Sequence, residues 1–329
     1  MASWLLTSRV RRYALRWAIL DVPTARSSHS VATPRGGGLA IASVVGAAIA
    51  GLAVAEVIEP RLAVALLGGG AMVVTIGWMD DRRPQPVWLR AMLQLAASAW
   101  AVSWLGGLPT LHAGPNVLRL GAAGGVLATL AIAWGINLYN FMDGIDGLAA
   151  GQAVVAGLVG ALLLTRDGSP GLAGVSATTA GAALGFLAWN WSPARIFMGD
   201  VGSGPLGFLF ATIGVASDRG GDSPLPVWLL LLGLFVFDAT VTLVRRMVRG
   251  DRWYAAHRLH AYQRAVQSGW SHRQVTIGAL FLMMVLGALA ITAAWHPDWT
   301  WRCVGVALAV LAACYLWIEF RRPMAAEGR

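Results

Sequence analysis

Blocks of about twenty apolar residues recur along this chain, and they restrict its fold more than any other feature. Such a block has the length that a helix needs to cross the hydrocarbon core of a bilayer. Backbone polar groups in lipid must be satisfied within the segment, so the blocks are predicted to be helices. Hydrophobic residues make up 57% of the 329 positions and charged residues only 12%. That is about half the charged fraction of a soluble domain. The sequence therefore predicts an all-α, polytopic transmembrane protein.

Ten full spans are expected. They are 37–58, 62–79, 87–105, 119–137, 147–165, 170–190, 201–217, 226–244, 275–295 and 301–319. Residues 1–8 are too short to cross a bilayer and precede an arginine-rich run from Arg9 to Arg16, so we interpret this part as a truncated first helix. No stretch between the blocks is long enough for a soluble domain. Residues 1–329 are predicted to form a single integral membrane domain.

Arginine determines the predicted orientation, because the chain contains no lysine and its net charge of +9 comes from arginine alone. The loops and ends on one side of the spans hold 20 of the 25 arginines, and those on the other side hold five. By the positive-inside rule, the arginine-rich side is cytoplasmic. We expect this basic charge to face anionic lipid and phosphate, and we expect no nucleic-acid partner.

Acidic, amide and histidine side chains gather on the same predicted side of the membrane. They come from separate loops and include Asp80, Asp81, Asn137, Asn140, Asp143, Asp146, Asn190, Arg195, Asp200, His257 and His260. Asp238 lies inside the predicted span 226–244, a turn or two from its cytoplasmic end. Clusters from distant sequence positions that converge on one face indicate a functional site.

Several carboxylates within reach of one point are typical of metal-assisted phosphoryl transfer. Carboxylate oxygens can hold Mg²⁺, which usually keeps waters and substrate phosphates as its other ligands. Such a metal neutralises charge on a diphosphate and steadies the leaving group. Asp143 and Asp146 are three residues apart, so on a helix they would share a face. Four helices are predicted to direct their positive dipole ends at this side; they begin near Gly38, Val87, Gly147 and Val201.

Each of these features also has a simpler interpretation. An Asp at the start of a helix is most often a cap, and for Asp146 alone that interpretation is favoured. Asp80 and Asp81 do not face the same way on a helix, so only one of them is expected to touch substrate. Asp238 is an intramembrane carboxylate and by default a functional candidate. Solvated surface is an alternative for His257 and His260, and it is the expectation for His112, His272 and His296.

Taken together, the motifs resemble those of the polyprenyl-phosphate N-acetylhexosamine-1-phosphate transferases, the bacterial glycosyltransferase family 4. That family includes initiators of O-antigen, enterobacterial common antigen and teichoic acid linkage synthesis, and it is related to the peptidoglycan translocase. The resemblance runs by motif from Asp21 to about Gln274, and it includes Met79-Asp-Asp-Arg82, Asn137-Leu-Tyr-Asn-Phe-Met-Asp-Gly-Ile-Asp146, Phe197-Met-Gly-Asp200 and His257-Arg-Leu-His260. It implies an active site formed by the cytoplasmic loops 21–37, 78–90, 137–148, 189–204 and 245–274.

The resemblance also implies roles for individual residues. Asp80 and Asp81 match the acidic pair near the acceptor phosphate, with Asp80 as the base. Asp200 matches the ligand of Mg²⁺, for which Mn²⁺ is an alternative. Contacts to uridine are implied for Asp146, Asn190 and Phe197, the last by stacking on uracil. Catalytic roles are expected of Asp80, Asp81, Asp143, Asp146, His257 and His260. Substrate binding is expected of His29, Arg35, Asn140, Asn190, Arg195, Phe197, Asp238 and Arg258.

The implied reaction transfers a sugar-1-phosphate from a UDP-N-acetylhexosamine to undecaprenyl phosphate, giving undecaprenyl-diphospho-sugar and UMP. It would initiate O-antigen or other cell-surface polysaccharide synthesis at the cytoplasmic face of a bacterial inner membrane. The His-x-x-His form of the histidine motif resembles initiators that use N-acetylfucosamine, N-acetylquinovosamine or N-acetylglucosamine. This chain departs from the family at Pro84, where a third acidic or amide residue often stands. A homodimer is a further expectation by resemblance.

Three rival functions compete with the transferase. A transporter of nucleotide-linked or lipid-linked sugars should carry its carboxylates near the bilayer midplane, whereas all but Asp238 fall at the cytoplasmic mouths of the spans. A prenyl-chain synthase needs two Asp-rich motifs, and this chain lacks the third acidic residue of even one. An inactive scaffold would not be expected to retain the full acidic set. Within the transferase, direct attack by the acceptor phosphate and a covalent aspartyl-phosphate route both stay open.

Overall fold

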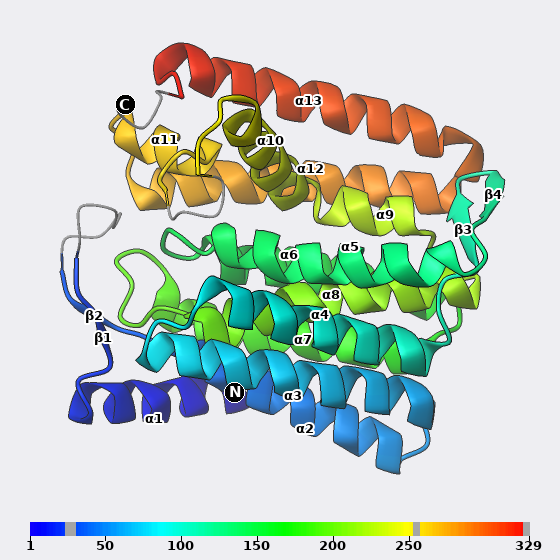
Figure 1. Ribbon diagram of the computed structural model, residues 1–329, viewed down its shortest axis with the longest axis horizontal. Coiled ribbons are helices and arrows are strands. Elements are labelled where there is room, and N and C mark those ends of the chain that lie inside the picture. The colour runs from blue at the N-terminus through cyan, green and yellow to red at the C-terminus, as the bar shows by residue number, and fades with distance from the viewer. Residues whose placement is uncertain (24–30, 253–256, 325–329) are drawn as a thin grey trace.

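The computed structural model describes residues 1–23, 31–252 and 257–324, and most of these residues are helical (Figure 1). The helices are α1 (Ala2–Arg16), α2 (Gly38–Val54), α3 (Pro60–Arg82), α4 (Val87–Leu105), α5 (Ala123–Phe141), α6 (Leu148–Arg166), α7 (Pro170–Asn190), α8 (Asp200–Gly220), α9 (Leu225–Leu231), α10 (Gly233–Val248), α11 (Ala261–Gln267), α12 (His272–Trp295), η1 (Pro297–Trp299) and α13 (Thr300–Arg321). Two antiparallel hairpins accompany them: β1 (Leu20–Asp21) with β2 (Thr33–Pro34), and β3 (Thr110–Ala113) with β4 (Asn116–Arg119). The prediction of an all-α polytopic fold is confirmed.

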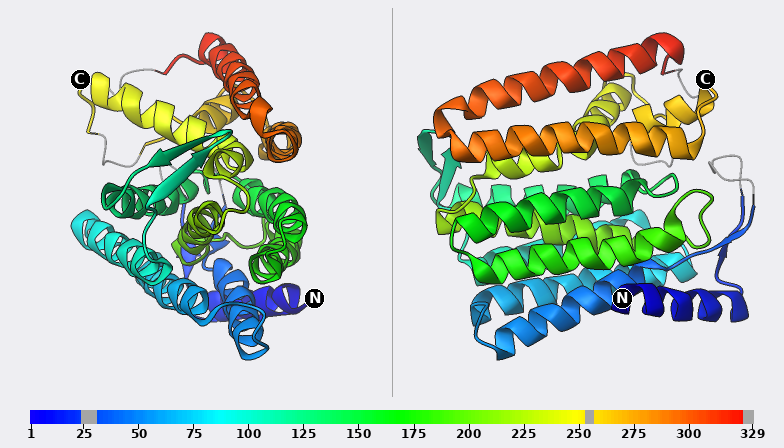
Figure 2. Two further views of the ribbon diagram at one scale, coloured as in Figure 1. Left: turned by 90° about the vertical axis from the view of Figure 1, so that its right-hand side faces the viewer. Right: turned by 180° about the vertical axis from the view of Figure 1, so that it is seen from behind.

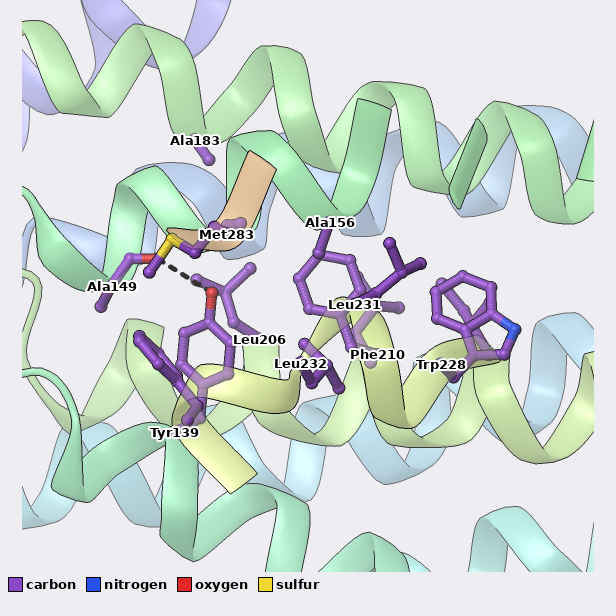
Figure 3. Close-up of a cluster of buried hydrophobic side chains, with 14 of the residues drawn as sticks. Tyr139, Ala149, Ala156, Ala183, Leu206, Phe210, Trp228, Leu231, Leu232 and Met283 are labelled. Atoms are coloured by element: carbon purple, nitrogen blue, oxygen red, sulfur yellow. Dashed lines mark hydrogen bonds between the residues drawn. The ribbon is translucent and has the colours of Figure 1, made fainter. Parts of the chain in front are cut away.

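The helices form one bundle in which α8 is the central member. It packs against α2, α3, α5 and α9, and most of its residues are buried. Figure 2, left, looks along the bundle and shows the other helices arranged around it. In the core, Tyr139 of α5 stacks on Phe210 of α8 with ring centroids 6.3 Å apart, and its hydroxyl donates to the carbonyl of Ala149 in α6 at 2.9 Å (Figure 3). This interior holds α5, α6 and α8 together and so fixes the loops at their ends.

Helices occupy all ten of the predicted span positions, although not all of them equally suit a bilayer. Among the described residues, six runs are long and apolar enough to cross a membrane by themselves; they are α3, α5, α6, α7, α12 and the run from η1 through α13. The pair α9 and α10 would add a seventh if both were counted as one span. The helix α2 is apolar but only 17 residues long. The multi-pass character of the protein follows from these helices.

The predicted span 226–244 is not one continuous helix, so that part of the prediction is wrong. The helices α9 and α10 meet at a bend of 83°, and α10 turns away from the direction of its neighbours (Figure 1). Gly233 begins α10, and glycine has a weak intrinsic preference for helix. At the bend, the carbonyl of Leu231 accepts a hydrogen bond of 2.9 Å from the buried side chain of Gln152 in α6. Broken helices are tolerated at membrane depth where neighbouring helices satisfy backbone groups in this way.

The hairpin β3–β4 lies at the opposite end of the bundle from β1–β2 (Figure 1). There the buried carboxylate of Asp218 accepts the backbone N–H groups of His112 at 3.1 Å and Leu225 at 2.9 Å. The Nδ1 atom of His112 lies 3.4 Å from the same carboxylate. A buried carboxylate needs donors around it. The expectation that His112 is merely a solvated residue is therefore wrong.

Replacing Gln152 with Leu should lower the melting temperature of the protein in detergent. The substitution keeps a side chain of similar size but removes the donor to the Leu231 carbonyl at the bend. Leaving a buried polar group without a partner costs about 1–3 kcal/mol. A melting curve of the Q152L variant that overlays the curve of the unmodified protein would contradict this account of the bend.

Candidate active site

Each helix from α2 to α8 has one of its ends at the end of the bundle that carries β1–β2, which we call the polar end. The helices α3, α5 and α7 finish there, and α2, α4, α6 and α8 begin there at Gly38, Val87, Leu148 and Asp200. These four starts lie within one residue of the predicted ones. The loops between these helices therefore bring the predicted site residues to one end of the molecule.

Asp81 connects the end of α3 to the start of α8. Its carboxylate oxygens accept the backbone N–H groups of Asp200 at 2.9 Å and Val201 at 3.1 Å, and its side chain is fully buried. The first N–H groups of a helix have no partner inside the helix, so a carboxylate there stabilises the start of α8. Gly199 permits the approach, because it adopts φ of +76° and a Cβ atom at this position would lie 2.4 Å from Asp81 Oδ2.

Arg35 joins the same contact from a third segment of the chain. Its Nε atom lies 2.7 Å from Asp81 Oδ1, and one terminal nitrogen donates to Asp200 Oδ1 at 2.6 Å. The backbone on either side is held in place, because Phe197 donates to the carbonyl of Pro34 and accepts from the N–H of Gly37. Burial by itself lowers the pKa of Arg35, but the charges of Asp81 and Asp200 outweigh it and raise the pKa above its ordinary value. Arg35 is thus a permanent cation between two carboxylates.

Asp80 points to a different partner from its neighbour Asp81. Its carboxylate accepts the N–H of Gln85 at 2.7 Å and pairs with Arg90 at 3.1 Å. The same nitrogen of Arg90 lies 3.6 Å from Asp200 Oδ2, so Arg90 bridges Asp80 and Asp200. The side chains of Asp80 and Asp200 are 12% and 17% exposed, whereas that of Asp81 is not exposed. Asp80 and Asp200 are therefore the two carboxylates of this group that a ligand can reach.

Sequence reasoning missed Arg90, although the chain contained a signal for it. The residue stands in the first turn of α4, where the helix dipole disfavours a positive charge. A cation in that position indicates that something negative lies in front of the helix. The two carboxylates of Asp80 and Asp200 are that negative partner.

The loop after α5 adds Asn140 and Asp143 to the polar end. Asn140 donates from Nδ2 to the hydroxyl of Ser203 in α8 at 3.1 Å. Burial raises the pKa of Asp143 well above its usual range, and the nearby charges of Asp200 and Asp81 raise it further, although Arg35 opposes them. Asp143 thus lies in the same electrostatic neighbourhood as the Asp81–Arg35–Asp200 contact.

Asp146 and Asn190 form a second group beside the first. The Asn190 side chain accepts the N–H of Gly147 at 3.0 Å and donates to the carbonyl of Ile196 at 3.0 Å. Asp146 accepts the N–H of Ala194 at 3.2 Å, and no side chain caps the start of α6. The interpretation of Asp146 as a helix cap is therefore wrong. The hydrogen bond from Ala194 to Asp146 joins the loop after α5 to the loop after α7.

His272 is the second partner of Asp146. Its Nδ1 atom lies 3.3 Å from Asp146 Oδ1, so the expectation that His272 is merely a solvated residue is also wrong. Burial raises the pKa of Asp146, but the hydrogen bond and charge of His272, together with hydrogen bonds from Ala194 and Ser192, outweigh burial, and the pKa lies below its usual range. Asp146 is consequently held as a carboxylate between two loops.

The histidine motif is supported by Asp238 from inside α10. The buried carboxylate of Asp238 accepts the N–H groups of Ala261 at 2.9 Å and Tyr262 at 3.2 Å, and it lies 3.4 Å from His260 Nδ1. These donors begin α11, so Asp238 fixes the helix that follows the motif. The rings of His257 and His260 lie 4.9 Å apart. The predicted contact of Asp238 with substrate stays a prediction, because the structure shows only this supporting role.

The structure shows fewer contacts for the remaining predicted site residues. Phe197 is partly buried in the loop before α8, and its backbone pairs with Pro34 of β2 and with Gly37. Arg195 is exposed, and its guanidinium lies 5.8 Å from the ring of Trp189. The carbonyl of Arg258 accepts a hydrogen bond from Gln267. His29 lies outside the described residues.

The donor chemistry of the polar end suits a hard cation bound together with a ligand. Among the described residues, no group of three or more His, Cys, Asp or Glu side chains is arranged to hold a metal by protein atoms alone. Mg²⁺ rarely needs such a cage, because one or two carboxylates plus water and substrate phosphates complete its coordination. Asp80 and Asp200 offer carboxylate oxygens that are partly exposed. Asp200 therefore fits a Mg²⁺ site that substrate phosphate and water would complete, with the carboxylate of Asp80 nearby across Arg90.

The fold and site define a class, that of multi-pass membrane proteins with a carboxylate and arginine cluster at one end of the bundle. Residues 63–218 match the glycosyl transferase family 4 model. The chain is 31% identical over 330 residues to decaprenyl-phosphate N-acetylglucosaminephosphotransferase of Mycobacterium tuberculosis (strain ATCC 25618 / H37Rv), covering 89% of this chain and 79% of that one. It is 29% identical over 295 residues to a probable undecaprenyl-phosphate N-acetylglucosaminyl 1-phosphate transferase of Bacillus subtilis (strain 168), covering 87% and 80%.

A third relative comes from Yersinia pestis. It is the undecaprenyl-phosphate alpha-N-acetylglucosaminyl 1-phosphate transferase, 30% identical over 318 residues, with 92% of this chain and 84% of the relative covered. The protein belongs to the polyprenyl-phosphate N-acetylglucosamine-1-phosphate transferase family. The resemblance found from its motifs is thereby confirmed.

The stability of the protein should fall as the pH drops below about 6.5 because of His257. Burial, followed by the charges of His260 and Arg246, lowers the pKa of His257 from 6.5 to about 3. The unfolded chain therefore takes up a proton at a higher pH than the folded protein does. The free energy of unfolding is unaffected by this group above pH 6.5 and falls progressively towards pH 3. At pH 5 the loss amounts to about 2 kcal/mol.

Melting temperatures in detergent between pH 7.5 and pH 5 measure this effect. The His257→Asn variant cannot take up that proton, so its melting temperature should fall less over the same range. Parallel curves for the two proteins would show that His257 is not the group responsible.

Proposed function

We propose that this protein transfers N-acetylglucosamine-1-phosphate from UDP-N-acetylglucosamine to undecaprenyl phosphate, giving undecaprenyl-diphospho-N-acetylglucosamine and UMP. The observation that carries the proposal is the cluster in which Arg90 bridges Asp80 and Asp200 while Arg35 bridges Asp200 and Asp81. Alternating carboxylates and guanidinium groups suit a reaction between two phosphate-bearing substrates and a divalent cation. The relatives, named for the same transfer to undecaprenyl or decaprenyl phosphate, support the same choice.

In the proposed reaction, an oxygen of the acceptor phosphate bonds to the β-phosphorus of the nucleotide sugar. The bond from that phosphorus to the oxygen bridging the α- and β-phosphates breaks, and UMP leaves with the electron pair. Asp80 is proposed to orient the acceptor phosphate as its base, and its partly exposed carboxylate, which Gln85 and Arg90 fix, supports this role. Arg90 and Arg35 supply positive charge next to the phosphates. Attack through a covalent aspartyl-phosphate is the alternative route.

Asp200 is the proposed protein ligand of Mg²⁺, with Mn²⁺ as a substitute. As the first residue of α8, it holds a partly exposed carboxylate at a helix start. When bound, the cation would neutralise charge on the diphosphate. Asp200 shares Arg90 with Asp80, and this common partner keeps donor and acceptor groups close together.

The donor side of the proposed site comes from the other loops. Asn190, Asp146 and Phe197 are proposed to contact the uridine, since they lie on the two loops that the Asp146–Ala194 and Asn190–Gly147 hydrogen bonds join. The histidine motif, with His257, Arg258 and His260, is proposed to contact the diphosphate or the sugar. N-acetylfucosamine and N-acetylquinovosamine donors are the alternatives to N-acetylglucosamine.

We further propose that the polar end faces the cytoplasm of a bacterial inner membrane. The arginine asymmetry of the loops supports this orientation, since 20 of the 25 arginines belong to the predicted cytoplasmic side. A product made there would start O-antigen or another cell-surface polysaccharide. A homodimer stays a prediction by resemblance.

The assay that tests the proposal measures UMP and lipid product from purified protein with Mg²⁺, undecaprenyl phosphate and a panel of UDP-sugars. Release of UMP should require the lipid, the cation and one sugar of the panel. A transporter of nucleotide-linked sugars would instead move UDP-sugar across reconstituted vesicles without cleaving it. Uptake without UMP release by folded protein would overturn the transferase proposal.

The Asp200→Asn variant should lose nearly all turnover while keeping its melting temperature. The amide removes the negative charge that Mg²⁺ needs but keeps the backbone N–H that Asp81 accepts. UMP release across a series of Mg²⁺ concentrations is the measurement. Activity equal to that of the unmodified protein at every concentration would remove Asp200 from the cation site.

The Arg90→Gln variant should lower kcat/KM for undecaprenyl phosphate by at least about tenfold, because Asp80 and Asp200 lose the cation between them. The matched control is Arg83→Gln, which removes an exposed arginine from the loop just before α4. Equal effects of the two substitutions would show that general charge, and not the bridge, matters.

A further inference from the structure

The last helix reaches the region of the histidine motif through a charged contact that sequence reasoning missed. Glu319, near the end of α13, accepts two hydrogen bonds from the guanidinium of Arg245 in α10, at 2.6 and 2.9 Å. The same carboxylate also pairs with Arg264 of α11. One side chain therefore joins α10, α11 and α13.

The burial of Arg264 makes this contact important for the stability of the fold. Its side chain is only 1% exposed, and it also donates to the carbonyl of Arg322 at 2.9 Å, just past the end of α13. Its guanidinium lies 4.9 Å from the ring of Tyr315, whose hydroxyl accepts a hydrogen bond from Arg245. A buried cation that loses its carboxylate partner is strongly destabilising. Glu319 thus determines where Arg264, and with it α11, can lie.

The helix α11 is coupled to the histidine motif and to the loop after α5. At its start, Ala261 and Tyr262 donate their N–H groups to Asp238 of α10, directly after His260. The hydroxyl of Tyr262 donates to the carbonyl of Phe141 at 2.9 Å, in the segment that leads to Asp143. A shift of α11 would therefore move the histidine motif relative to the acidic loop.

We propose that Glu319 is a positioning residue for the donor half of the active site. By fixing α11 against α10, it sets where the histidine motif stands, without touching substrate itself. The inference rests on the proposed function, in which this motif contacts the diphosphate or the sugar. The acceptor half is placed independently, because Asp80 and Arg90 lie on α3 and α4, whereas α13 packs against α9, α10, α11 and α12 (Figure 2).

The test is steady-state kinetics of the Glu319→Gln variant with UDP-N-acetylglucosamine and undecaprenyl phosphate, each varied in turn. We expect kcat/KM for the nucleotide sugar to fall between about tenfold and a hundredfold, the range that small misplacements of reacting groups produce. The KM for undecaprenyl phosphate should change less than about twofold, since the acceptor groups do not move. Glu319→Asp keeps the charge and should recover part of the loss. The matched control is Glu59→Gln, which removes an exposed glutamate at the start of α3.

A double variant separates positioning from general damage. In a His257→Asn background, Glu319→Gln should reduce donor kcat/KM by less than about twofold, because the motif it positions is already impaired. Trypsin should also cleave the Glu319→Gln protein faster after Arg249, Arg252 or Arg258 than it cleaves the unmodified protein. This second measurement needs no activity.

The outcomes are distinct. Unchanged donor kinetics in Glu319→Gln would overturn the inference, and so would equal losses for donor and acceptor accompanied by a lower melting temperature. Independent, multiplicative losses in the double variant would overturn it as well. An unmodified protein that releases no UMP with any donor would instead count against the proposed function.

Discussion

The carboxylate of Asp81 is the contact on which the polar end of this protein depends. It lies in α3, accepts the first N–H groups of α8 and pairs with Arg35, which comes from the segment after β2. A helix start needs acceptors, and a buried carboxylate needs donors and a counter-charge. The carboxylate of Asp81 accepts from the start of α8, and the N–H groups of α8 together with Arg35 supply its donors and counter-charge. Three segments distant in sequence therefore meet at one point. The contact between Asp81 and the start of α8 also fixes the position of Asp200, because Asp200 is the first residue of α8.

Asp238 plays a corresponding part for the histidine motif. It is buried in α10 and accepts the first N–H groups of α11, as Asp81 does for α8. The bend between α9 and α10 turns α10 away from the bundle direction, and Gln152 satisfies a carbonyl at that bend. The carboxylates near the site therefore divide by burial. Asp81 and Asp238 support the backbone, while the partly exposed Asp80 and Asp200 share Arg90 and are available to ligands.

Much of this arrangement was predictable, and the failures share a cause. The apolar blocks predicted the helices, and the positions of Asp80, Asp143 and Asp200 after every second span predicted that they would meet. The pairings of His112 with Asp218 and of His272 with Asp146 join residues more than a hundred positions apart. No local pattern encodes such pairs, so both histidines were expected to be solvated. The bend at Leu232 escaped prediction because the residues on both sides of it are apolar.

The sequence by itself determined the membrane environment, the family and the set of polar residues at one end of the bundle. Those properties follow from composition and from local order, which a bilayer constrains strongly because it allows few backbone structures. The tertiary structure decided which member of each polar pair supports the fold and which faces a ligand. Asp80 and Asp81 are adjacent in the chain, yet one is partly exposed beside Arg90 and the other is fully buried against α8. Only packing could make that distinction, since burial depends on the neighbours that distant segments supply.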